Sequence, residues 1–236
     1  MHKELIGSRT PYSLTQEKPW KLYWFLKFPT YLCTLMKEII LDKATEMFLN
    51  LGFKSVTMDD LANEVGISKK TIYNHYENKT KLVQECTNQL FHKISVGIEA
   101  ICAIGKNPIE ELYDIKKFVI VNLKDEKSSP QYQLEKYYPK ISSQLKAKQH
   151  ALMQKCTINN LERGVKMGLY MEDLNIPFVS RIYIAGISSI QDPEIFPQEL
   201  FSFGRLQSYF LEYHLRSITT PMGKKILNQI IYSDQF

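Results

Sequence analysis

Polar and basic side chains gather at residues 68–76 and just beside them, and their types suit contacts with a nucleic acid. Lysine and threonine donate hydrogen bonds to phosphate oxygens, whereas tyrosine, asparagine and histidine can reach base edges or the thymine methyl group in a major groove. We therefore predict DNA contacts from Thr57, Lys69, Lys70, Thr71 and Lys79 to phosphates and from Tyr73, Asn74 and His75 to bases. The alternatives are packing of the two aromatic rings on a neighbouring helix and plain solvation of the two adjacent lysines.

A helix-turn-helix is the frame that would hold these side chains in a groove. It needs a small residue where two helices cross and a turn residue that tolerates a positive φ. Ala62 and Gly66 stand four positions apart and meet both needs, while Leu61 and Ile72 supply apolar groups for the buried face. Without this frame, the lysine-rich stretch would be an ordinary solvated helix face.

Capping residues set the limits of the two helices. Thr57 opens a short helix that runs to about Val65, and Asp60 occupies the capping-box position three residues later. Ser68 opens the next helix, which runs to about Tyr76. The N-terminal end of the first of these helices would also favour a phosphate near Thr57.

The remaining periodic segments all predict helices. A first amphipathic helix covers Lys37 to Leu51 and ends at Gly52, and Asn78 caps a long fourth helix that would link two domains. Further helices are expected at 108–124, 131–138, 139–168, 176–190, 203–218 and 222–232, with loops at 127–130 and 192–197. The predicted fold class is all-α.

Composition and charge exclude several classes of protein. The net charge of +5 is mild and residues 36–82 are balanced, but residues 66–82 carry four lysines against one acid. The four cysteines form no CxxC pair or zinc pattern, and the histidines outside the 68–76 stretch stand alone, so we expect no metal, no cofactor and no disulfide framework. Because no nucleophile elbow, phosphate loop, HExxH or paired-carboxylate signature occurs, we do not expect an enzyme.

The first 35 residues admit three interpretations. The aromatic stretch Leu22 to Met36 is broken by Lys27 and Pro29, and it could be a signal-peptide core, although it lacks a small-residue cleavage site. The segment could instead be an arm that touches DNA or a partner subunit, or Met36 could be the biological start. We favour the misassigned start. No run of 18 apolar residues occurs, so we expect no membrane-spanning helix. The scattered cysteines suit free thiols in a reducing cytosol, and we expect a cytoplasmic protein.

At Ile39 to Leu82 the sequence resembles the tetracycline-repressor (TetR) family of regulators. The residues that carry the resemblance are Ala44, Phe48, Gly52, Phe53, Val56, Thr57, Leu61, Ala62, Val65 to Ser68, Thr71 to Tyr76 and Asn78 to Leu82. Tyr76 departs from the usual phenylalanine and Lys70 from a common small residue, and the lysine could add a phosphate contact.

The resemblance implies a three-helix DNA-binding domain at 36–82 and a helical regulatory and dimerisation domain at 83–236, with 1–35 as an extra segment. It also implies a four-helix dimer interface from two late helices, here about Phe178 to Ile190 and Phe203 to Ile218. The expected function is a ligand-responsive repressor that binds double-stranded, palindromic DNA as a homodimer. A transcriptional activator or a ligand-independent DNA-binding protein is the alternative.

An apolar effector would need a pocket in the second domain. Aromatic and methionine side chains with polar tips suit such a pocket, and the candidates are Tyr113, Phe118, Tyr137, Tyr138 and Met153. Plain core packing is the alternative for each of them.

Overall fold

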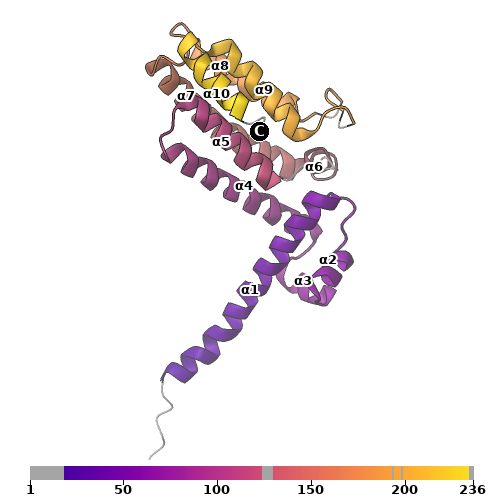
Figure 1. Ribbon diagram of the computed structural model, residues 1–236. Helices are drawn as coiled ribbons and strands as arrows, with labels where there is room; N and C mark the ends of the chain where they lie inside the picture. The colour runs from indigo at the N-terminus through magenta and orange to yellow at the C-terminus, as the bar shows by residue number, and fades with distance from the viewer. Residues whose placement is uncertain (1–18, 124–129, 193, 198, 234–236) are drawn as a thin grey trace, which may run out of the picture. The chain divides into compact units, whose positions relative to one another are not determined.

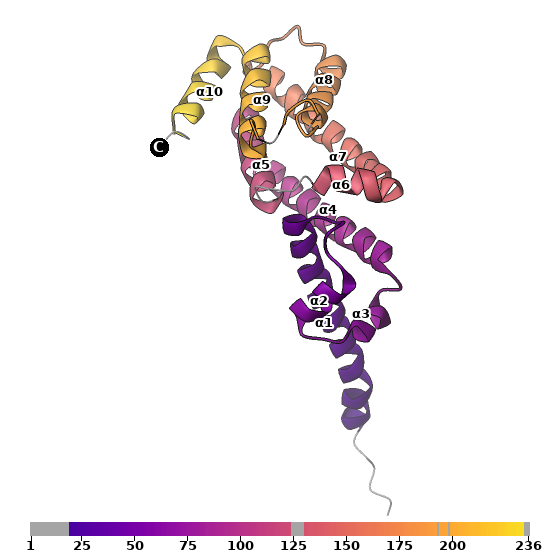
Figure 2. The ribbon, with the colours of Figure 1, turned by 90° about the vertical axis from the view of Figure 1, so that its right-hand side faces the viewer.

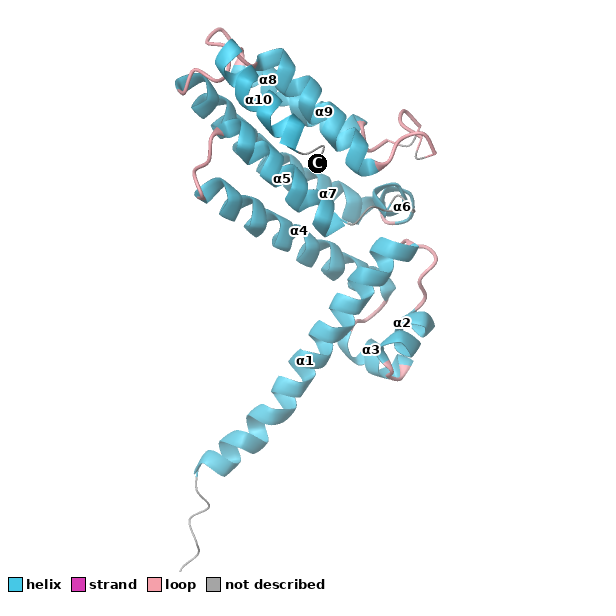
Figure 3. Ribbon diagram, viewed as in Figure 1, coloured by secondary structure: helices cyan, strands magenta, loops and turns pink. Residues whose placement is uncertain are grey.

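The computed structural model describes residues 19–123, 130–192, 194–197 and 199–233 (Figure 1). The chain divides into two compact units, residues 1–39 and 40–236, and each is described by itself. Within the described ranges every regular element is a helix, as Figure 3 shows, with an isolated antiparallel bridge between Tyr170 and Thr219. The prediction of an all-helical fold is confirmed.

The first unit holds the start of helix α1, whose bounds are Pro19–Leu51. We predicted a helix that begins at Lys37, and this start is wrong because the helix reaches back to Pro19. Proline suits a first helical position, where its missing N–H loses no partner. Pro29 lies inside the helix, although an interior proline removes one backbone hydrogen bond and disfavours a helix. Residues 1–18 of the predicted extra segment lie outside the described residues.

The second unit opens with residues 40–51 of α1, followed by α2 (Met58–Val65) and α3 (Lys69–His75). Gly52 and Gly66 end α1 and α2 with φ angles of 85° and 74°, a region that favours glycine. The predicted caps are present, because the Thr57 side chain accepts from the Asp60 N–H and the Ser68 side chain accepts from the Thr71 N–H.

The larger part of the second unit contains seven helices in its described residues. They are α4 (Lys79–Ala103), α5 (Pro108–Leu123), α6 (Pro130–Tyr137), α7 (Pro139–Lys166), α8 (Ile176–Ser189), α9 (Phe203–Ile218) and α10 (Pro221–Ser233). These bounds lie within two residues of the predicted ones, and Asn78 caps α4 as expected. Helix α5 packs against α4, α7, α9 and α10, while α7 also packs against α6 and α8 (Figures 1 and 2).

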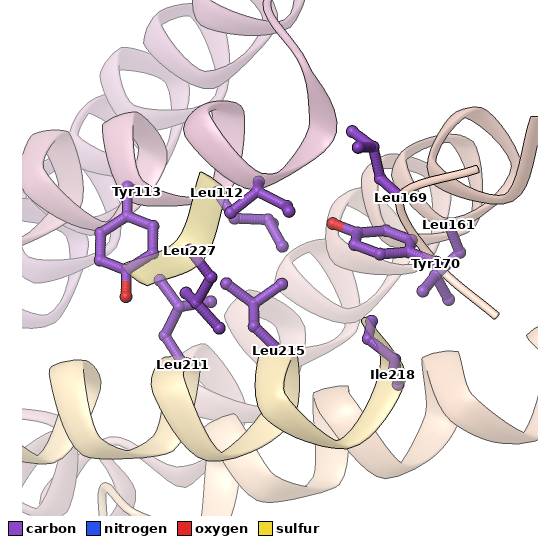
Figure 4. Packing of buried hydrophobic residues seen from close by; sticks show 10 residues of the cluster. Leu112, Tyr113, Leu161, Leu169, Tyr170, Leu211, Leu215, Ile218 and Leu227 are labelled. Atoms are coloured by element: carbon purple, nitrogen blue, oxygen red, sulfur yellow. The ribbon is translucent and has the colours of Figure 1, made fainter. Parts of the chain in front are cut away.

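The core of this part lies where α5, α7, α9 and α10 meet (Figure 4). Its members are buried apolar side chains, and each one contributes about 1.5–3 kcal/mol to the free energy of folding. They are Ile109, Leu112, Tyr113, Leu161, Leu169, Tyr170, Leu211, Leu215, Ile218 and Leu227. This core holds together the long helices that follow α4 in the chain.

A buried polar network fastens α5 to α7 beside this core. Glu111 is 1% exposed, and its carboxylate accepts from Arg163 Nη1 and from Asn160 Nδ2, both at 2.8 Å. The Tyr170 hydroxyl donates to Asn160 Oδ1 at 3.0 Å. Arg163 also donates to the Lys106 carbonyl oxygen in the turn between α4 and α5. Because each buried polar group has a partner, the network fixes the relative register of the two helices.

Candidate nucleic-acid interface and internal cavity

The inner side of the helix-turn-helix is apolar, and this fixes the direction in which α3 presents its outer side. Ile72 of α3 is fully buried, and Ala62 of α2 is buried where the two helices cross. The Ile67 N–H donates to the Ala62 carbonyl oxygen at 3.0 Å, so the turn closes directly on the crossing residue. Tyr76 is buried next to α3, and burial raises the pKa of its phenol.

The outer side of α3 carries three of the predicted contact residues. Lys70, Tyr73 and Asn74 are exposed, and their spacing of three and four positions puts them on one helix face. Thr71 and His75 are partly buried at the edges of that face, and the Thr71 hydroxyl is hydrogen-bonded to the Ser68 hydroxyl at 2.8 Å. A helix face with an ammonium, a phenol and an amide has the groups that major-groove contacts require.

Thr57 is exposed at the start of α2, and its hydroxyl already has two hydrogen bonds. It donates to Asp60 Oδ2 at 2.7 Å and accepts from the Asp60 N–H at 3.1 Å. The Thr57 N–H donates to the same carboxylate, and these hydrogen bonds hold the pKa of Asp60 below its ordinary value. A phosphate contact from the Thr57 hydroxyl stays a prediction, and it would have to compete with this capping box.

Two of the predicted phosphate lysines have protein partners. Lys69 Nζ lies 2.7 Å from Asp59 Oδ2, and this hydrogen bond raises the pKa of the lysine. Lys79 is partly buried, with Nζ 3.5 Å from the Lys54 carbonyl oxygen and 5.8 Å from the centre of the Phe48 ring. Burial lowers the pKa of Lys79. Lys70 is therefore the better candidate for a phosphate contact that costs no internal interaction.

An apolar cavity of about 290 Å³ lies in the second unit. Side chains of α1 and α4 to α9 line it, together with residues of the segments 52–57 and 190–202. Its volume is near the lower limit of the roughly 300–1,000 Å³ that is usual for small-molecule sites. The wall is mainly leucine, isoleucine and phenylalanine, with amides of Gln149, Gln191 and Gln207 and the ammonium of Lys116 as polar groups.

One of the five predicted pocket residues lines this cavity, namely Met153. The other four are absent from its lining: Tyr113, Phe118, Tyr137 and Tyr138. Tyr113 belongs to the buried core, and Tyr137 is 38% exposed. Phe118 packs on Gly97 of α4, and a β-carbon at that glycine would collide with the Phe118 ring.

Two features of the cavity escaped the sequence analysis. Leu49 and Phe53 line it, although both belong to the helix-turn-helix part of the chain. Phe196, Phe201 and Phe203 also line it, the first from the predicted loop at 192–197, the second from the stretch after that loop and the third from the start of α9. The signal in the sequence was the density of phenylalanine, since an exposed loop gains nothing from so many large apolar rings.

The segment between α1 and α2 contacts α6 directly. Gln133 Oε1 accepts from the Lys54 N–H at 3.1 Å, and Lys54 Nζ lies 5.3 Å from the centre of the Tyr137 ring. The rings of Phe53 and Tyr138 meet edge to face with centres 6.2 Å apart. A displacement of α6 would therefore act on the chain just before α2.

Large apolar side chains are exposed on α8 and α9. Phe178 and Ile182 lie one turn apart on α8, Tyr209 and Tyr213 lie one turn apart on α9, and each is more than half exposed. The two helices pack on each other. Among the described residues no helix has the length and apolar character needed to cross a membrane, and no His, Cys, Asp and Glu side chains form a group that could hold a metal ion.

The fold and the α2–α3 corner define an all-helical helix-turn-helix protein. Residues 40–86 match the model of the bacterial regulatory proteins of the tetR family. The helix-turn-helix of this chain is therefore similar to that of these regulators, as the resemblance in the sequence indicated. The regulators of this family bind DNA and usually act as dimers with small-molecule effectors.

Two curated regulators are similar to part of the chain. The biofilm operon icaADBC HTH-type negative transcriptional regulator IcaR of Staphylococcus epidermidis is 33% identical over 57 residues, which are 24% of this chain and 31% of that protein. The HTH-type transcriptional regulator YhgD of Bacillus subtilis is 36% identical over 86 residues, which are 35% of this chain and 45% of that protein. The chain thus matches less than half the length of either relative.

Solved structures extend the likeness to the whole fold. A TetR-family transcriptional regulator from Agrobacterium tumefaciens has a TM-score of 0.64 at 17% identity, over 80% of this chain and 100% of that one. A transcriptional regulator from Saccharomonospora viridis in complex with choline has a TM-score of 0.65 at 15% identity, over 79% of this chain and 99% of that one. At these identities the likeness shows the fold alone.

Proposed function

We propose that this chain is a transcriptional repressor that binds a palindromic operator as a homodimer and is released from it by a small, largely apolar effector. The outer face of α3 carries the proposal, because Lys70, Tyr73 and Asn74 stand exposed on a helix held at a helix-turn-helix corner. The repressing action is supported by the Staphylococcus epidermidis relative, whose name describes negative regulation.

In the proposed complex α3 enters the major groove. Tyr73, Asn74 and His75 contact bases, while Lys70 binds a phosphate from the exposed face of α3. Lys69, Thr71, Thr57 and Lys79 complete the predicted phosphate set. Of these, Lys79 has the largest structural role, since it packs on Phe48. Its substitution would therefore weaken the domain as well as the complex.

The homodimer would form through α8 and α9. The apolar face of Phe178, Ile182, Tyr209 and Tyr213 is the kind of surface that a two-fold interface buries. Two α3 helices related by such an axis read half-sites about 34–36 Å apart, one turn of DNA, so the operator would be a palindrome.

The effector would act through the walls of the cavity. Leu49 and Phe53 bring the helix-turn-helix part to the cavity, and Leu134 brings α6. Helix α6 in turn holds the Lys54 N–H through Gln133. A ligand that displaces α6 or Phe53 would thus move the start of α2 and change the half-site spacing of the dimer. The long helix α4, which carries lining residues and begins directly after the helix-turn-helix, offers a second route.

Selection of bound fragments from random DNA tests the proposal. The expected result is an enriched palindrome, bound by the dimer. The absence of any enriched sequence, together with the absence of salt-dependent retention on DNA, would contradict DNA binding. On that palindrome, Tyr73→Ala should weaken specific binding by about 1–3 kcal/mol, and Lys70→Ala should weaken all sequences alike and reduce the salt dependence.

Lys93→Ala is the matched control, because Lys93 is also an exposed helical lysine but lies 14 positions beyond Lys79 on α4. It should bind like the unmodified chain. If Tyr73→Ala and Lys70→Ala also bind like the unmodified chain, α3 is not the reading helix. Transcription measured from the selected operator then separates repression from activation. Gel shifts with a panel of apolar compounds test for an effector, and a ligand-independent protein should bind DNA equally with and without every compound.

A further inference from the structure

The cavity has a polar edge where α5 meets α9. Lys116 of α5 donates from Nζ to Ser208 Oγ of α9 at 3.3 Å. Lys116 lines the cavity, and so does Gln207, which precedes Ser208 on α9. The hydrogen bond joins α5 to α9 beside these two lining residues. The rest of the lining is dominated by apolar side chains.

The charged group among the described residues that line the cavity is a lysine. Lys116 is the only charged side chain among the described residues that line the cavity, and none of those residues is an aspartate or glutamate. Its Nζ also lies 4.6 Å from the centre of the Tyr113 ring. A positive charge at the rim of a low-dielectric space attracts anions and repels cations.

Gln207 adds a hydrogen-bonding group that the protein itself does not use. The residue is 8% exposed, and its side-chain amide makes no hydrogen bond within the described part of the chain. A side-chain amide at the cavity wall can pair with a polar group of a ligand, and such a hydrogen bond adds affinity. The amide can donate to one oxygen of a head group while Lys116 donates to the other.

We propose that the cavity binds a medium-length amphipathic carboxylate, with its head at Lys116 and Gln207 and its hydrocarbon body among the leucine and phenylalanine side chains. This inference rests on the proposed function, since it names the chemical class of the effector. An apolar cavity of about 150 Å³ binds benzene, so a cavity of about 290 Å³ suits a ligand of roughly ten to twelve non-hydrogen atoms. Octanoate has this size and chemistry.

Calorimetric titration of the full chain with octanoate, octan-1-ol and octylammonium tests the class. The three probes share the same chain and differ in the head. Octanoate should bind about 10- to 100-fold more tightly than octan-1-ol, because a hydrogen bond to a charged group is worth more than one between neutral groups. Octylammonium should not bind. Equal affinity for the acid and the alcohol, preference for the cation, or no binding of octanoate would overturn the proposal.

Two variants test the residues. Lys116→Met keeps the length of the side chain and should lower octanoate affinity about 10- to 100-fold while octan-1-ol binds as before. Gln207→Leu should lower octanoate affinity about 2- to 10-fold. Lys117→Met is the matched control, since Lys117 is the next lysine on α5, is exposed and does not line the cavity. It should leave octanoate binding unchanged. Normal octanoate binding by Lys116→Met would overturn the assignment of the head.

DNA binding is measured separately on each variant by gel shift, which also shows that the protein is folded. If octanoate binds through Lys116 but the chain binds no DNA, the proposed function fails and the ligand class stands. If DNA binds and octanoate does not, the ligand class fails and the repressor stands. Release of the operator by octanoate, lost in Lys116→Met, would support both.

Discussion

His214 makes the stability of this protein depend on pH in a way that the structure quantifies. Its ring lies in α9, is 6% exposed, and has the Tyr183 ring 4.5 Å away between centres and the Phe210 ring 6.4 Å away. Burial lowers the pKa of His214 from 6.5 to about 4. The folded protein therefore binds fewer protons at this site than the unfolded chain between these pH values.

The sign follows from this difference. The contribution of His214 to stability is fully present above pH 6.5 and falls as the pH drops towards 4. The complete loss is about 3 kcal/mol, and about 2 kcal/mol of it should occur between pH 7 and pH 5. His214→Phe has no proton to bind, so its free energy of unfolding should fall by about 2 kcal/mol less over this interval.

Urea denaturation at pH 7, 6 and 5 measures this effect, with the slope against pH as the readout and the absolute stability of the variant as a separate quantity. Other titrating groups contribute equally to both proteins and cancel in the comparison. His150→Phe is the control, because His150 is exposed on α7, and its slope should match that of the unmodified chain. If His214→Phe keeps the full pH dependence, the ring is not held neutral by burial and the reasoning fails.

Two further predictions concern polar contacts of the fold. Glu111→Leu should lower the free energy of unfolding by about 1–3 kcal/mol, because it leaves Arg163 and the buried Asn160 without their shared acceptor. Glu111→Gln should lower it by less. Unchanged stability of Glu111→Leu in denaturant titration would contradict a structural role. Thr57→Ala should cost about 1 kcal/mol through the loss of the capping box. Ser55→Ala nearby serves as its control, and an equal melting temperature for the two variants would refute the cap.

The helix-turn-helix was predictable because its signals are local. A cap, a crossing residue and a turn glycine act within about ten residues, and Thr57, Ala62, Gly66 and Ser68 each do what their types favour. The start of α1 was not predictable from the same rules. The apolar periodicity begins only at Lys37, and Pro29 disfavours a helix before it, yet α1 reaches back to Pro19.

The cavity depends on contacts between segments far apart in the sequence, and no periodicity contains them. Tyr113 has the polar tip and apolar ring of a pocket residue, and it is buried in the core instead. Lys79 lies at the start of α4, where a phosphate contact was predicted. Its ammonium also lies near the Phe48 ring and the Lys54 carbonyl oxygen. Residue type limits what a side chain can do, and only its neighbours decide which of those uses is realised.

The proposed regulation depends on side chains that the helix-turn-helix and the cavity share. Leu49 and Phe53 take part in the apolar packing of the helix-turn-helix and also in the wall of the cavity. Because the walls of the cavity are closely packed, a ligand that exceeds the space beside Phe53 displaces the ring and its neighbours. The Gln133 contact to the Lys54 N–H transmits the same change from α6. The residues that couple effector and DNA would thus be core residues, which sequence patterns describe only as apolar.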